Sequence, residues 1–204
     1  PFVQQTSIIM NKVVLITGGS SGIGKSIGEF LHQKGFVVYG TSRNPERVLN
    51  SIFPLVALDV RDTDSIHAAV AKVIAISGRL DVVINNAGVG ITGPLEEIPM
   101  HEIKNNFETN FFGPIEVMKA VLPQMRSQKS GLIINITSIA GYMGLPYRSV
   151  YSASKGALEL ITEALRMEVK SFGVNITNVA PGDFATNIAS GRFHAPVIKG
   201  SAYE

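Results

Sequence analysis

The 204-residue sequence contains no cysteine. This absence excludes disulfide bonds, thiolate metal sites and a cysteine nucleophile. Histidine is scarce as well, and its four positions show no spacing typical of metal ligands: His32, His67, His101 and His194. Surface positions explain these histidines better than a metal site, so we expect no bound metal.

Charged residues are also few, at 17% of the chain, and the net charge is only +2. No run of lysine or arginine occurs, so the sequence gives no support for nucleic-acid binding. No stretch is long and apolar enough to span a membrane, and residues 1–9 lack the charged start and cleavage pattern of a signal peptide. We therefore expect a cytoplasmic protein without a nucleic-acid or membrane partner.

What the sequence does contain is a regular alternation of strand-like and helix-like segments. Continuous apolar runs predict strands at 12–17, 36–42, 54–60, 80–86, 131–138 and 174–181. Helical patterns lie between them at 23–34, 62–78, 99–128 and 150–171. Continuous apolar strands are typical of a parallel sheet that is covered on both faces. The sequence therefore predicts an α/β fold, a doubly wound (Rossmann-type) parallel β-sheet with helices on both faces.

The segment LITGGSSGIG, residues 15–24, places three glycines where the first strand ends and a helix begins. In a dinucleotide site, Gly18 would make the tight turn and Gly22 would let the backbone approach a pyrophosphate. Gly24 would let the helix pack closely on the strand. The N-terminus of the helix offers unpaired N–H groups and the positive end of its dipole to a phosphate.

Further polar residues follow the other predicted strands at the same edge of the sheet, where such folds bind ligands. Ser42 and Arg43 stand where an NAD-preferring site usually has an acidic residue, about 20 residues past the glycines. Arg43 can pair with a 2′-phosphate and Ser42 can add a hydrogen bond, which favours NADP(H) over NAD. Asp59 either accepts a hydrogen bond from an adenine amino group or only begins the next helix.

The segment YSASK places Tyr151 and Lys155 four residues apart, on one face of a helix. A tyrosine phenol has a pKa near ~10, and a neighbouring ammonium favours the phenolate. Alone, this spacing is common on exposed helices. Its position after Ser138 and after a dinucleotide-type glycine turn makes the combination specific.

These segments together resemble the short-chain dehydrogenase/reductase family, from about Lys12 to Thr186. The matching segments, in order, are TGGSSGIG, LDV, NNAG, the asparagine of FETNFFG, ITSIAG, YSASK and PGDFAT. The resemblance implies that Tyr151 is the general acid/base and that Ser138 hydrogen-bonds the substrate oxygen. It also implies that Lys155 lowers the pKa of the tyrosine and holds the nicotinamide ribose, and that Asn110 belongs to a proton relay.

The implied reaction is reversible hydride transfer between a nicotinamide and a carbonyl or secondary alcohol. The residues expected to contact NADP(H) are Thr17, Gly18, Ser20, Ser21, Gly22, Ile23, Gly24, Ser42, Arg43, Asp59, Val60, Asn86, Ala87, Gly88, Tyr151, Lys155, Pro181, Gly182 and Thr186. A mostly apolar substrate wall is expected from Tyr142, Met143, Leu145, Pro146, Tyr147, Phe184, Ile188 and Phe193, although several of these could merely pack a lid or the core. Two alternatives remain: a non-catalytic NADP-binding sensor, and an epimerase or dehydratase on the same fold.

The chain is expected to form a single domain, 1–204, that assembles as a homodimer or homotetramer. Residues 1–11 read as an extension, and the family pattern continues beyond residue 204. Residues 183–204 are expected to be irregular, and those from about 187 poorly packed. Pro114 lacks an N–H for the carbonyl of Asn110, so we expect the helix at 99–128 to kink there and leave that carbonyl open to a water or to Lys155.

Overall fold

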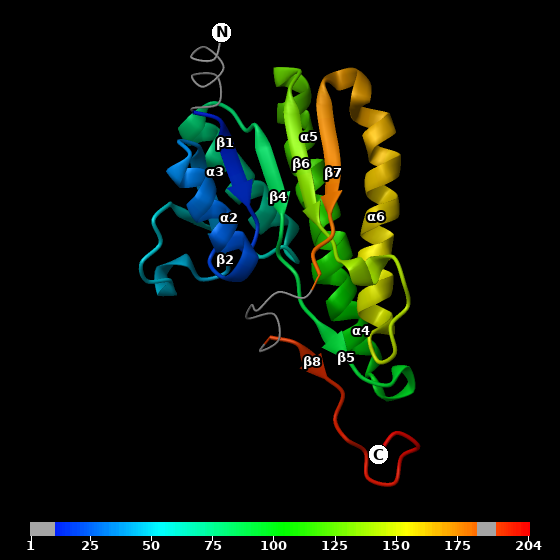
Figure 1. The fold of residues 1–204 in the computed structure, drawn as a ribbon. Coiled ribbons are helices and arrows are strands. Elements are labelled where there is room, and N and C mark those ends of the chain that lie inside the picture. Colours follow the sequence, from blue (N-terminus) through cyan, green and yellow to red (C-terminus); the bar gives the residue numbers. More distant parts are fainter. Residues whose placement is uncertain (1–10, 183–190) are drawn as a thin grey trace.

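A six-stranded parallel sheet forms the centre of the computed structural model, which describes residues 11–182 and 191–204 (Figure 1). Thr186, Phe184 and Ile188 fall outside the described residues. The sheet strands are β1 (Val13–Ile16), β2 (Val37–Ser42), β3 (Leu55–Ala57), β4 (Val82–Asn85), β6 (Gly131–Ile136) and β7 (Val174–Val179). Each predicted strand is therefore present, although several are shorter than the apolar runs that predicted them.

Helices connect the strands in the alternating order that the sequence predicts. The α-helices are α2 (Gly22–Gln33), α3 (Thr63–Ser77), α4 (Met100–Phe107), α5 (Gly113–Gln128) and α6 (Ser149–Val169). Short 3₁₀ helices are η1 (Pro45–Arg47), η2 (Leu95–Glu97), η4 (Ile139–Gly141) and η5 (Lys170–Phe172), and η3 (Glu108–Phe112) is a π-helix. Local chemistry sets the ends of α3: the Asp62 side chain accepts a hydrogen bond from Ser65 N, and Gly78 ends the helix at a φ of 69°.

The strand order is β3-β2-β1-β4-β6-β7, and all neighbouring strands are parallel. The sheet thus extends from β1 through β2 to β3 on one side. The chain then crosses to β4, on the other side of β1, and the sheet continues through β6 to β7. The carboxyl ends of β1 and β4 meet at this reversal, which is where doubly wound sheets bind ligands. The predicted fold class is confirmed.

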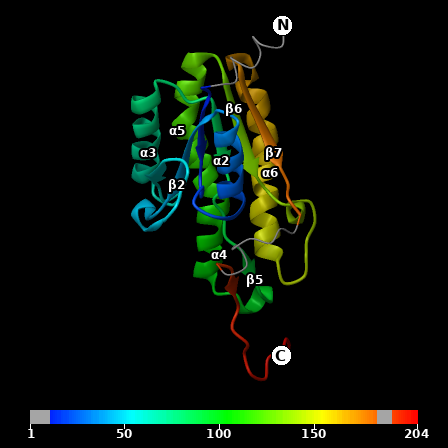
Figure 2. The same cartoon turned by 60° about the vertical axis from the view of Figure 1, so that its left-hand side comes forward.

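Helices lie on both faces of the sheet (Figure 2), although Asn175 and Val179 of β7 stay exposed. Helices α3, α5 and α6 pack with Leu15, Val83 and Ile133 on one face. Helix α2 packs on the other face, through Ile27 and Leu31. Covering on both sides explains why all four residues of β1 are buried and apolar.

A second, two-stranded sheet lies beyond the carboxyl ends of the main strands (Figure 1). Its strands, β5 (Ile91–Thr92) and β8 (Phe193–His194), are parallel. Phe193 and Ala195 pack against buried Ile91 and Ile98. The expectation of an irregular, poorly packed tail is therefore wrong at 193–195, because pairing with a distant segment partly buries Phe193 and Ala195.

The predicted helix at 99–128 is divided into α4, η3 and α5. In η3 the Gly113 N–H donates to the Glu108 carbonyl, a bond that spans five residues rather than four. Pro114 then stands in the first turn of α5, where a missing N–H costs nothing. The interruption lies where the proline predicted it, but its form is a π-helix, a feature frequent at functional sites.

Candidate active site

A cavity of about 880 Å³ lies at the carboxyl ends of the sheet strands and gathers most of the predicted residues. It is lined by Gly18, Ser20, Ser21, Gly22, Ile23, Ser42, Arg43, Asp59, Val60, Asn86, Ala87, Gly88, Ser138, Tyr151, Lys155, Pro181 and Gly182. Three predicted residues, Thr17, Gly24 and Asn110, are not among the lining residues. Thr17 and Asn110 are buried behind the wall, at 1% and 0% exposure, and Gly24 is buried in α2.

The glycine turn after β1 has a backbone that only glycine adopts easily. Gly18 has a φ of 64° and Gly22 a φ of 53°, both in the left-handed region. At Gly24 the restriction is space: a Cβ there would lie 2.5 Å from the Gly18 carbonyl oxygen and would also overlap the Asn86 amide. The turn therefore packs tightly on itself and leaves its backbone facing the cavity.

Hydrogen bonds tie this turn to the end of β4. The Thr17 hydroxyl accepts from Asn86 N and from Ala87 N, each at 3.0 Å. The Asn86 amide donates to the carbonyls of Thr17 and Gly18, at 3.0 and 3.2 Å. Asn86 and Thr17 thus act by fixing the shape of the turn, a partnership between distant segments that the sequence does not reveal.

The ends of β2 and β3 carry the charged part of the cavity. Arg43 is exposed and lines the cavity. The Asp59 carboxylate contacts Arg61, which donates through its backbone N at 3.0 Å and through its guanidinium at 3.3 Å. Burial raises the pKa of Asp59, but the hydrogen bonds and charge of Arg61, with the charge of Arg43, outweigh it and lower the pKa overall. An adenine contact would have to share this carboxylate with Arg61.

Lys155 is the most buried charged group of the site, at 4% exposure. Its Nζ donates to the Ile136 carbonyl at 2.9 Å and lies 6.0 Å from the centre of the Tyr151 ring. Burial lowers the pKa of Lys155 to about 8, and the charge of Glu159 opposes this fall. Gly88 borders the ammonium closely, since a Cβ there would lie 3.5 Å from Nζ.

Ser138 lies at the end of β6 and begins η4. Its hydroxyl oxygen accepts from Ala140 N at 3.2 Å. This contact uses a lone pair of the oxygen and leaves the hydroxyl proton for a different acceptor. Ser138, Tyr151 and Lys155 line the same cavity, as the sequence predicts.

The Asn110 side chain pairs with the backbone of Val89 in both directions. Its Oδ1 accepts from Val89 N and its Nδ2 donates to Val89 O, each at 2.9 Å. Asn106, one turn earlier, accepts from the same Nδ2 at 3.3 Å and donates to Val89 O at 3.1 Å. Sequence reasoning missed Asn106, although its spacing of four residues from Asn110 puts both amides on one helical face.

The apolar substrate wall is gathered only in part. Phe193 lines the cavity, together with Ile91 and Val89. Three arginines that were not predicted also line the cavity: Arg61, Arg148 and Arg192. Exposed Tyr142, Met143, Pro146 and Tyr147 are not among its lining residues, and neither is partly buried Leu145.

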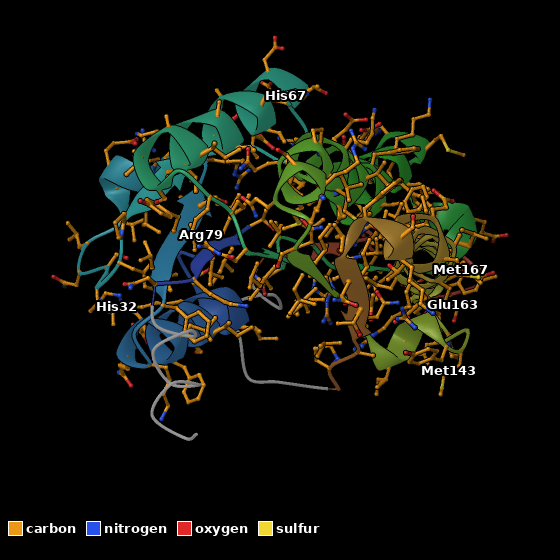
Figure 3. All side chains as sticks on the ribbon, turned by 90° about the horizontal axis from the view of Figure 1, so that it is seen from above. His32, His67, Arg79, Met143, Glu163 and Met167 are labelled. Carbon is orange, nitrogen blue, oxygen red and sulfur yellow. The ribbon has the colours of Figure 1, made fainter. Side chains whose placement is uncertain are left out.

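The histidines do not cluster. All four are exposed, and Figure 3 shows His32 and His67 at well-separated places on the molecule. Among the described residues, no group of three or more histidine, cysteine or acidic side chains could hold a metal ion. No helix in residues 11–182 and 191–204 is long and apolar enough to cross a membrane.

A Rossmann-type sheet whose glycine turn shares a cavity with a Tyr-x-x-x-Lys pair defines a nucleotide-binding oxidoreductase. The sequence model of the short chain dehydrogenase family matches residues 12–196. The chain belongs to this family.

Relatives and solved structures agree with this assignment. The chain is 47% identical, over 89% of its length and 67% of the relative, to 3-ketodihydrosphingosine reductase of Bacteroides thetaiotaomicron. It is 37% identical, over 88% and 67% of the two chains, to the uncharacterized oxidoreductase YusZ of Bacillus subtilis. A short-chain dehydrogenase structure from Streptomyces avermitilis superposes with a TM-score of 0.88 at 37% identity. The match covers 95% of this chain and 74% of that chain. The structure of ElxO with NADP bound superposes with a TM-score of 0.83 at 33% identity, and the match covers 89% of this chain and 79% of that chain.

Proposed function

We propose that this chain catalyses reversible hydride transfer between NADP(H) and the carbonyl or secondary alcohol of a small, largely apolar molecule. The observation that carries the proposal is the meeting of Ser138, Tyr151 and Lys155 in the cavity that the glycine turn also lines. The relative that is 47% identical is named as a reductase of a keto compound, which supports carbonyl reduction.

The residues of the cavity fit a dinucleotide. Gly18 and Gly22 present backbone without side chains where a pyrophosphate would lie, at the N-terminus of α2. Lys155 borders Gly88 at the cavity wall, and its ammonium would hold a ribose hydroxyl of the cofactor. When bound, the nicotinamide supplies or accepts the hydride.

The protein residues then handle the proton and the substrate oxygen. In the direction of reduction, the Ser138 hydroxyl donates a hydrogen bond to the carbonyl oxygen of the substrate. Tyr151 transfers its phenolic proton to that oxygen as it becomes an alkoxide. The Lys155 ammonium, near the Tyr151 ring, stabilises the phenolate that remains. In the proposed reaction each of the three residues thus has one task.

Replacing Tyr151 by phenylalanine tests the catalytic part of the proposal, because the ring stays and only the hydroxyl is lost. We expect the wild type to oxidise NADPH in the presence of a panel of ketones, followed at 340 nm. Turnover should fall by about 10²–10⁴-fold in Tyr151→Phe, while the Kd for NADPH stays within about twofold. Full turnover by the variant would refute the role of Tyr151. Tight NADPH binding by the wild type without turnover of any ketone or alcohol would favour the alternative function, a non-catalytic NADP-binding sensor.

The preference for NADP(H) rests on Arg43, an exposed guanidinium at the cavity wall beyond β2. A charge-assisted pair with a 2′-phosphate is available to Arg43, and NAD(H) lacks that phosphate. Arg47 offers a matched control, because it is exposed, lies in the same connection and is not among the lining residues.

Calorimetric titration of both cofactors tests this preference. Arg43→Ala should weaken NADPH binding by about 10- to 100-fold, the worth of a hydrogen bond to a charged group, and leave NADH binding unchanged. Arg47→Ala should change neither. Equal affinity of the wild type for NADH and NADPH would overturn the preference.

We also propose that the chain forms one domain and assembles as a homodimer or homotetramer. Leu160 and Met167 lie seven residues apart on α6 and are 69% and 75% exposed, which suits a helix that packs on another subunit. Sedimentation velocity tests this, and a monomer at micromolar concentration would contradict it. A cytoplasmic location stays a prediction, to be tested by fractionation of cells.

A further inference from the structure

Glu159 is a buried carboxylic acid that the proposed mechanism does not use. Its exposure is only 8%, although glutamate is almost never fully buried unless it is paired. It follows Lys155 by four residues and Tyr151 by eight on α6, so the three side chains form one row along the helix. The buried acid thus continues the line of the catalytic couple.

The two oxygens of the Glu159 carboxylate differ in their partners. Oε2 accepts from the Asn178 amide on β7. Oε1 is buried and has no hydrogen-bond partner among the described residues. An ionised carboxylate with an unsatisfied oxygen is costly in the interior unless a positive charge compensates it.

Lys155 is the cation placed to compensate it. Lys155 and Glu159 project from α6 toward adjacent strands: Lys155 Nζ binds the carbonyl of Ile136 on β6, and Glu159 binds Asn178 on β7. The two strand positions are neighbours, because Ile136 pairs with Val179, the residue after Asn178. Among the described residues, Glu159 is the charged group whose field acts on Lys155.

We propose that Glu159 is a positioning residue of the catalytic couple, whose buried carboxylate keeps the Lys155 ammonium charged and held at the end of β6. The role rests on the proposed function, since the charge of Lys155 is what would stabilise the Tyr151 phenolate. Burial alone would drive Lys155 toward its neutral form in the physiological range, because its pKa is already lowered to about 8. The negative charge of Glu159 opposes that fall.

Other titratable groups lie near Glu159 but do not share its position. Tyr142, which follows η4, is 64% exposed. Its pKa is raised by desolvation, by the charge of Glu159 and a side-chain hydrogen bond to it, and by the charge of Glu163. Glu163 stands one turn further along α6 and is exposed at the outside of the molecule (Figure 3). The pKa of Lys155 responds to the charge of Glu159 and not noticeably to that of Glu163. Glu163→Gln is therefore a control that removes the same charge from the same helix.

The experiment measures the ionisation of Lys155 directly, by NMR titration of the lysine side chains of the full chain without cofactor or substrate. Lys155→Arg identifies the signal. Glu159→Gln should lower the pKa of Lys155 by about one unit or more, and Glu163→Gln should leave it unchanged. In an active enzyme, the alkaline loss of kcat should move to lower pH by the same amount in Glu159→Gln alone.

Two further variants separate charge from mere packing. Asn178→Ala removes the bond that ties Glu159 to β7 but keeps the carboxylate, so the Lys155 pKa should change by less than about half a unit. Should Glu159→Gln fail to fold, Glu159→Asp can be measured instead. This variant keeps the charge, so the Lys155 pKa should again change by less than about half a unit. An unchanged Lys155 pKa in Glu159→Gln, or a full-unit fall in Asn178→Ala or Glu159→Asp, would overturn the proposal. The NMR titration does not depend on turnover, so the two proposals can fail independently.

Discussion

Replacement of Gly24 by alanine should damage both stability and cofactor binding through one added methyl group. The methyl carbon would lie 2.5 Å from the Gly18 carbonyl oxygen and would overlap the Asn86 amide, so either the turn or the amide must move. The Asn86 amide is what holds the carbonyls of Thr17 and Gly18. Its displacement would loosen the turn that faces the proposed pyrophosphate.

The magnitude follows from three contributions. Overpacking of this kind costs about 2 kcal/mol, and weakening of the Asn86 hydrogen bonds costs about 1 kcal/mol more. Alanine recovers about 1 kcal/mol because its helix propensity is higher than that of glycine. The net loss of about 2 kcal/mol corresponds to a fall in Tm of about 4–8 °C for a chain of this size.

Thermal unfolding followed by circular dichroism measures this fall, and fluorescence titration measures the Kd for NADPH. We expect the Kd to rise by at least about tenfold, because the turn no longer holds its shape. Gly144→Ala is the control. Apart from the two chain neighbours, no described residue has an atom within 4 Å of a Cβ at that position, so the Tm should change by less than about 2 °C. If Gly24→Ala matched Gly144→Ala in both Tm and Kd, the close packing inferred for the turn would be refuted.

Three other predictions follow from single side chains. Asp81 is buried, which raises its pKa, but the hydrogen bonds from Arg79 and Val13 N, with the charges of Arg79 and Lys12, outweigh this and lower the pKa. Its stabilising effect should be present above about pH 4 and disappear in more acid solution, so the free energies of unfolding of wild type and Asp81→Asn should converge there in urea titrations. Thr17→Val removes the acceptor of two backbone N–H groups, and urea unfolding should show a loss of about 2 kcal/mol. Pro114→Ala supplies an N–H that can reach the Asn110 carbonyl, so kcat should fall by about tenfold or more without a lower Tm; an unchanged kcat would separate Pro114 from the proton relay.

The fold was predictable because its signals are local. Buried runs such as that of β1 reveal a two-sided parallel sheet, and Asp62 and Gly78 mark both ends of α3 in the sequence itself. The pairing of β5 with β8 was not predictable. Each strand has two residues, and its partner lies about a hundred positions away. Such short strands have no periodicity to detect.

The candidate site was predictable as a set of residues but not as a set of contacts. The glycine turn and the Tyr-x-x-x-Lys pair have fixed spacing, so they can be found in one sequence. The contact of Lys155 with the Ile136 carbonyl and that of Asn110 with Val89 use backbone atoms, which every residue offers. Residue identity therefore cannot point to them. Arg148 and Arg192 likewise reach the cavity only through the folded course of the chain.

Burial is what turns the tyrosine and lysine pair from a common helical spacing into a candidate catalytic couple. On an exposed helix a lysine four residues from a tyrosine is screened by water, and its charge has little effect on the phenol. Lys155 is instead enclosed by the end of β6, Gly88 and the rest of α6, so its charge acts at low dielectric. The same enclosure lowers the pKa of Lys155 and makes its charge costly to keep. One turn further along the same face of α6 stands Glu159, the acid that we propose offsets this cost.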